Sequence, residues 1–181
     1  MTDSQNQQSK HHPLMQLTEE LTGISLLDSG TVNPFFMLAV GNEALQIPVD
    51  FSNNEQLEFT TVKIAAILQL KKCDHYCFAT RIQFKATAGG KEVMKQQVLI
   101  LFATKTESNN EHSTGYDCSA QLYDLKLNQE LGRPQLKAQQ KLEDYDGQFS
   151  NLFSAPKVPD DLMEQLTANV EQYHYSATES Q

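Results

Sequence analysis

The sequence predicts an α+β protein with a mainly antiparallel sheet of about five strands and helices packed on one face of it. Stretches with apolar residues at helical spacing alternate with stretches whose apolar residues recur at every second position. Tight-turn signals separate neighbouring strand-like stretches, as in β-hairpins. The predicted order is helix, two strands, helix, three strands, helix, in a chain of 181 residues that can bury one sizeable core.

The first helix is predicted from Pro13, because leucines recur at helical spacing through PLMQLTEELTGISLL. Two apolar runs follow, at residues 35–40 and 44–51, and the intervening GNE predicts a β-hairpin. Pro48 lacks a backbone N–H donor. The second of these strands is therefore expected at an edge of the sheet or bulged at that residue.

A second helix is predicted over residues 55–71, where a broad apolar stripe recurs at helical spacing. Ser52 or Asn53 is suited to cap it, because their side-chain oxygens accept hydrogen bonds from the first free N–H groups of a helix. We expect this helix to pack on the sheet.

Three strands are predicted next. From Tyr76 onward apolar and polar residues alternate at a spacing of two, and AGGK then marks a tight turn. The run at 92–105 is apolar on both faces around VLILF, which is typical of a central strand. A polar hairpin loop at 108–115 leads into the third strand, at 116–128.

The C-terminal part has a weaker pattern. Residues 135–153 are interpreted as a short helix and a loop, and the acidic pair at 160–161 is suited to the positive N-terminus of a last helix. The polar ends, residues 1–12 and 176–181, are expected to be disordered tails. This leaves residues 13–175 as a single domain.

The formal net charge is −9 and the sequence pI is about 4.9. Lys71-Lys72 is the basic cluster that the linear sequence suggests, beside scattered single lysines. Direct binding of nucleic acid is not expected, since it needs clustered Lys and Arg. An acidic surface favours a basic protein partner instead, by electrostatic steering.

The lack of a recognisable targeting signal and the number of cysteines predict a cytoplasmic protein. The N-terminus lacks the basic start and apolar run of a signal peptide, and no window approaches the roughly 20 apolar residues of a membrane span. The three cysteines are an odd number, so reduced thiols are expected.

The stretch CDHYC, which begins at Cys73, raises the question of a metal or redox site. If Cys73 and Cys77 lay on one strand, they would be roughly 13 Å apart and could not share an ion or form a disulfide. A zinc site would also need ligands such as Cys118, His112 or His174, and no second ligand-spaced pair exists. We therefore interpret the cysteines as small apolar core residues.

No catalytic residue, metal ligand or cofactor site is predicted. His112 and Ser113 are adjacent in a polar loop, and adjacent residues rarely form the base and nucleophile of a triad. The EDYDG stretch at 143–147 lacks the full frame of a calcium loop, and Gly89-Gly90 is a hairpin turn without a phosphate-binding motif.

Two function classes remain. The first is a non-enzymatic acidic module that binds a protein partner through a sheet face, a strand edge or a helix; a homodimer also fits this class. In size, acidity and alternation of helices and strands the chain resembles bacterial secretion chaperones and toxin-immunity proteins, and an inhibitor that caps a basic surface belongs with them. The second is an enzyme or small-ligand binder with a pocket between helix 55–71 and the sheet.

The candidate partner-binding residues are Phe35, Phe36, Arg81, Gln83 and Lys85. Neighbouring residues of a strand point to opposite faces, so one phenylalanine of the pair is expected to point away from the other. An exposed phenylalanine there would mark an interface, unless the first or the last helix covers it. Arg81, Gln83 and Lys85 share the polar face of their strand and are the candidate lining of the alternative pocket.

Overall fold

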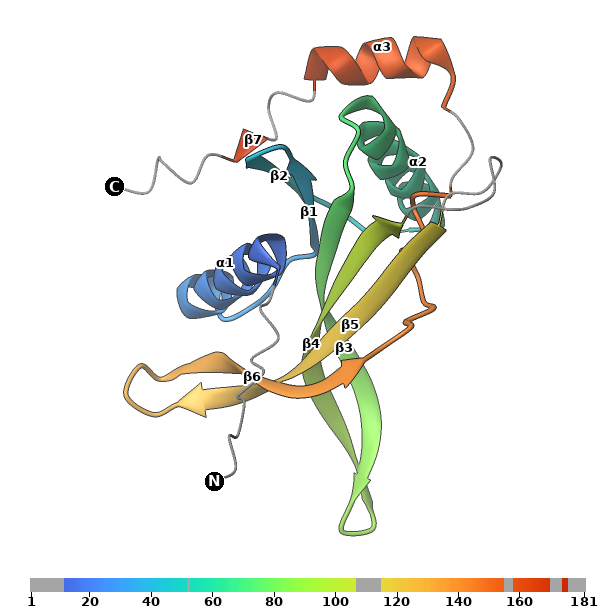
Figure 1. Ribbon diagram of the computed structural model, residues 1–181. Coiled ribbons are helices and arrows are strands. Elements are labelled where there is room, and N and C mark those ends of the chain that lie inside the picture. Colours follow the sequence, from blue (N-terminus) through green and yellow to red (C-terminus); the bar gives the residue numbers. More distant parts are fainter. Residues whose placement is uncertain (1–11, 52, 107–114, 155–157, 170–173, 176–181) are drawn as a thin grey trace, which may run out of the picture.

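The computed structural model describes residues 12–51, 53–106, 115–154, 158–169 and 174–175. This part of the chain forms three helices and seven strands (Figure 1). In chain order these are α1 (Pro13–Ser29), β1 (Phe35–Val40), β2 (Glu43–Pro48), α2 (Asn54–Leu70), β3 (His75–Ala88), β4 (Lys91–Thr106), β5 (Gly115–Asn128), β6 (Arg133–Leu142), α3 (Asp160–Asn169) and β7 (His174–Tyr175).

The strands form one sheet in the order β6-β5-β4-β3-β1-β2-β7, and every neighbouring pair is antiparallel. The predicted α+β class with an antiparallel sheet is confirmed. β2 lies next to the edge strand β7, which has two residues and pairs only with Ala44 and Leu45. Pro48 is the last residue of β2.

The predicted strand number was too low by two, because β6 was taken for a helix and a loop and the two-residue β7 was not predicted. The register of β5 with β6 skips Gln139, which makes a β-bulge opposite Leu122 and Tyr123. The bulge changes which face alternate residues point to, so Leu136 and Leu142 belong to opposite faces. A period-two pattern cannot persist through such an irregularity.

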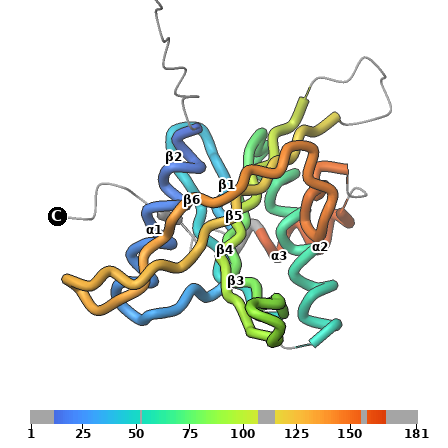
Figure 2. The backbone as a smooth tube through the Cα atoms, turned by 90° about the horizontal axis from the view of Figure 1, so that it is seen from below, coloured from blue at the N-terminus to red at the C-terminus, as the bar shows by residue number. Residues whose placement is uncertain are grey.

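The expectation of helices on one face was wrong. Figure 2 shows α1 and α2 on opposite sides of the sheet. Leu14, Met15 and Leu26 of α1 belong to one core cluster, whereas Ile64 and Leu68 of α2 belong to another. An apolar stripe predicts that a helix is covered, but it does not say which face of the sheet the helix covers.

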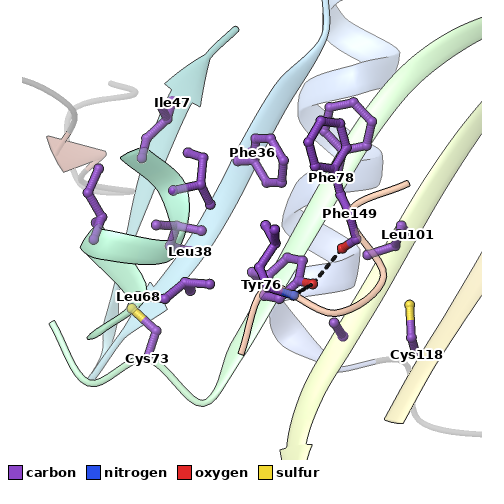
Figure 3. Close-up of a cluster of buried hydrophobic side chains, with 14 of the residues drawn as sticks. Phe36, Leu38, Ile47, Leu68, Cys73, Tyr76, Phe78, Leu101, Cys118 and Phe149 are labelled. Atoms are coloured by element: carbon purple, nitrogen blue, oxygen red, sulfur yellow. Dashed lines mark hydrogen bonds between the residues drawn. The ribbon is translucent and has the colours of Figure 1, made fainter. Parts of the chain in front are cut away.

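The core on the α2 side of the sheet is rich in aromatic rings (Figure 3). Phe36 lies 4.6 Å from Phe78 and 5.2 Å from Phe149, measured between ring centroids. The buried Tyr76 hydroxyl donates to the Phe149 carbonyl oxygen at 2.5 Å and accepts from the Leu152 N–H at 3.1 Å. These contacts attach the segment after β6 to the middle of the sheet.

His12 is the first residue that the structure describes, although the sequence placed it in a disordered tail. It caps α1, and its ring lies 4.3 Å from that of His75 and 5.1 Å from that of Phe102. The rest of the two predicted tails, residues 1–11 and 176–181, lies outside the described residues.

The hairpin of β3 and β4 is longer than the strands beside it. β1 pairs with residues 76–79 of β3, and β5 pairs with residues 97–106 of β4. Among the described strands, residues 83–88 and 91–96 pair only with one another, and Arg81 and Ile82 have no strand neighbour besides β4. We call residues 81–96 the β3–β4 arm; Figure 1 shows it projecting from the helix-covered body.

Candidate functional site

The Phe35-Phe36 pair does not form an exposed surface. The two side chains point to opposite faces of the sheet, as expected, but their exposed fractions are only 6% and 0%. Phe35 lies in the core on the α1 side, and Phe36 lies in the core on the α2 side. A partner cannot reach either ring, so neither residue is a binding candidate. The structure supports the interpretation in which the first helix covers one face of this strand, because Phe35 packs in the core on the α1 side.

Arg81, Gln83 and Lys85 are exposed on the β3–β4 arm. They follow Cys77 at a spacing of two, which places them on the α1 side of the sheet. They cannot line a pocket between α2 and the sheet, because α2 covers the other face. The predicted pocket lining was therefore wrong, whereas their place on an accessible surface agrees with a binding role.

The arm exposes apolar side chains that were not among the candidate partner-binding residues. Ile82 packs against the core on the α2 side, and Phe84 continues the same face outward with 37% of its surface exposed. Val93 lies on that face too, since it pairs with Ala86, and it is also 37% exposed. Met94, on the other face, is 60% exposed. Apolar atoms are thus accessible from both sides of a two-stranded ribbon.

The arm is also basic. It contains Arg81, Lys85, Lys91 and Lys95 against one acid, Glu92, a net charge of +3. The other residues of the chain then hold ten Lys and Arg against 22 Asp and Glu, a net charge of −12. Lys85 and Glu92 form an ion pair at 3.6 Å that is well exposed and therefore weak.

This basic region was missed because its charges are spaced along two strands. Four of the chain's 14 Lys and Arg residues lie in the 16 residues from 81 to 96, which include the AGGK turn. That local excess of positive charge was the available signal. Its projection from the body depends on the lengths of the neighbouring strands. That property is set by pairing between distant segments.

The three cysteines are free and buried, which confirms their interpretation as core residues. Cys77 lies on the α1 side of the sheet, and Cys73 and Cys118 lie on the α2 side. Burial raises the pKa of each thiol to about 12. Because nucleophilic attack and metal binding use the thiolate, none of the three is poised for that chemistry at neutral pH.

A cavity of about 340 Å³ lies where α2 turns into β3. It lies at the C-terminal end of α2, where Leu68 and Gln69 of the helix and Lys105 of β4 line it. Two lysines, Lys72 and Lys105, and one carboxylate, Asp74, lie at its wall, a net charge of +1, and Leu68 and Phe153 supply apolar surface. This composition would suit a small anion with an apolar part. The lining residues are Leu68, Gln69, Lys72, Cys73, Asp74, Lys105, Leu152 and Phe153.

The remaining candidates were a metal site, the His112-Ser113 pair and the EDYDG stretch. Within the described ranges, no three His, Cys, Asp or Glu side chains are grouped so that they could hold a metal ion. His112 and Ser113 lie outside those ranges. Asp144, in the EDYDG stretch, has a left-handed φ of 49° in an exposed turn.

His12 is a titratable helix cap. Its Nδ1 accepts a hydrogen bond from the Leu14 N–H at 3.1 Å. Burial lowers the pKa of His12, and the neighbouring His75 lowers it further. Protonation would turn Nδ1 into a donor and place a positive charge at the positive end of α1.

We expect this cap to weaken the fold in mild acid. Between the lowered pKa of folded His12 and its unfolded value of about 6.5, the unfolded chain binds more protons, so stability falls as the pH falls through that window. The His12→Asn variant replaces the Nδ1 acceptor of the cap with a side-chain oxygen and does not titrate. Urea unfolding of both proteins at pH 8 and pH 5 should show a smaller loss for the variant. Equal losses would contradict this role of His12.

Comparisons with protein-family models, with curated proteins and with solved structures found no match for this chain. None of the helices in the described ranges is long and apolar enough to cross a membrane. The β3–β4 arm therefore stands as the candidate site on its geometry and charge alone.

Proposed function

We propose that the protein is a non-enzymatic module that binds a protein partner through the β3–β4 arm. The observation that carries the proposal is the exposure of Phe84, Val93 and Met94 on a basic ribbon that projects from an acidic body. Apolar side chains clustered on an exposed element, with charges around them, are typical of interaction sites.

The energetics of the arm support this role. A two-stranded ribbon without further neighbours is marginally stable in water, and exposed apolar side chains contribute little to it. The apolar side chains on the α2 side of β3 become more exposed along the arm, from the half-buried Ile82 to the exposed Phe84. A partner that covers these side chains would remove their apolar surface from water and brace the ribbon at the same time.

The charge of the arm also bears on the partner. The net charge of the whole chain favours a basic partner, but the accessible apolar residues lie among cations. An acidic surface with an apolar centre suits them better. Nucleic acid suits them less, because the net charge of −12 on the rest of the chain repels a phosphate backbone.

The test is capture of partners from native lysate, with wild type compared against the Phe84→Ser/Met94→Ser variant. We expect one protein to be captured reproducibly by wild type and at least about tenfold less by the variant, since apolar anchors at interfaces commonly contribute more than 1 kcal/mol each. The matched control is Leu127→Ser/Leu131→Ser on the other long hairpin, where both leucines are more than half exposed.

Equal capture by wild type and the arm variant would contradict the proposal. Absence of any captured protein, together with thermal stabilisation by small anions that the Lys72→Ala/Lys105→Ala variant abolishes, would favour the alternative of a small-ligand binder at the cavity beside α2.

A further inference from the structure

The outer side of α2 is a second surface with exposed apolar residues. Phe59 and Val62 are 60% and 47% exposed. By helical spacing they lie opposite the side that carries Leu57 and Ile64, which pack toward the sheet. The apolar surface of this helix therefore extends beyond what the sheet covers.

Acidic side chains lie on the same two packed helices as this apolar surface. Glu55 and Glu58 of α2 are exposed, and α3, which packs on α2, adds the exposed Asp160, Asp161 and Glu164. The two helices carry one cation, the half-buried Lys63, so their net charge is −4. We call the seven exposed residues the α2–α3 patch: Glu55, Glu58, Phe59, Val62, Asp160, Asp161 and Glu164.

The β3–β4 arm and the α2–α3 patch are complementary. The arm presents apolar residues among basic ones, and the patch presents apolar residues among acidic ones. Lys91 and Lys95 lie on the same face of the arm as Phe84 and Val93, because they pair with Ala88 and Phe84. The first strand of the arm, residues 81–88, is about 26 Å long and the second, residues 91–96, is about 20 Å long, which is comparable with the length of about 26 Å for α2.

We propose that the arm of one copy of this chain binds the α2–α3 patch of a second copy. The arm projects from one end of the molecule and α3 lies at the other, so an arm is not placed to cover the patch of its own chain (Figure 1). The contact joins two different surfaces. Two copies that exchange arms reciprocally form a closed dimer, and successive copies form a chain.

This inference rests on the proposed function, in which the arm is the binding surface, and it names the partner as a second copy. The first measurement is the apparent mass by light scattering and sedimentation, across protein concentrations up to about 200 µM and at two salt concentrations. We expect the mass to exceed one chain and to rise with concentration. In 0.5 M NaCl, where the Debye length shortens to about 4 Å, association should weaken severalfold.

Charge reversal then identifies the two surfaces. The arm variant is Lys91→Glu/Lys95→Glu, and the patch variant is Glu55→Lys/Glu58→Lys. We expect each variant alone to associate at least about tenfold more weakly than wild type. An equimolar mixture should recover association, because the reversed arm and the reversed patch again carry charges of opposite sign. The control is Lys126→Glu/Lys137→Glu on the neighbouring hairpin, which should associate like wild type.

A wild-type protein that stays monomeric at every concentration would overturn this inference alone. So would association that survives in either charge variant, or a mixture that fails to recover it. The proposed function fails by a different result, which is capture of a partner by the Phe84→Ser/Met94→Ser variant as efficiently as by wild type. Circular dichroism of each variant checks that loss of association is not loss of folding.

Discussion

Replacing Phe36 with alanine is expected to lower the free energy of unfolding by about 3–5 kcal/mol. The ring is fully buried between the sheet and α2, and it contacts Tyr76, Phe78 and Phe149. Alanine would leave a cavity that the surrounding rings cannot fill without leaving their rotamers. Urea unfolding followed by circular dichroism measures the change.

The same substitution at Phe84 is the matched control. Phe84 lies on the same face of the sheet, six residues beyond Phe78 along β3, but more than a third of its surface is exposed. We expect its loss to cost less than about 1 kcal/mol, as is usual at exposed positions. Similar losses for the two variants would show that Phe36 is not a core residue, and would return it to the set of candidate partner contacts.

Replacing Tyr76 with phenylalanine is expected to lower the free energy of unfolding by about 2–4 kcal/mol. The change keeps the ring and removes one oxygen, which leaves the Phe149 carbonyl and the Leu152 N–H without their buried partner. Each unsatisfied buried group costs about 1–3 kcal/mol. Urea unfolding again measures the stability, and limited proteolysis should cut the segment around residues 149–152 faster than in wild type.

Tyr116→Phe is the control for the loss of a tyrosine hydroxyl. Tyr116 is half-buried beside the same core cluster, and its change is expected to stay within about 0.5 kcal/mol. If Tyr76→Phe were equally mild, the segment after β6 would be held by its apolar residues and not by the tyrosine hydroxyl.

The candidate site was partly predictable. The exposure of Arg81, Gln83 and Lys85 follows from their alternation with apolar residues, which the sequence shows directly. Phe84 belongs to the apolar side of that alternation, which is the side that a covering helix usually buries. It is exposed because α2 does not extend over the outer part of the hairpin (Figure 1), and the reach of a helix over a distant strand is not a local property.

Local periodicity was sufficient for the two long helices, for β1 to β5, and for the burial of the three cysteines, because these features depend on residues close together in the chain. The tertiary structure decided which face of the sheet each helix covers and how far β3 and β4 extend past their neighbours. It thereby also decided that the basic residues of the β3–β4 arm project from the rest of the molecule. Those properties arise from pairing and packing between segments far apart in sequence, where a side chain's environment is set by partners that its own neighbours do not specify.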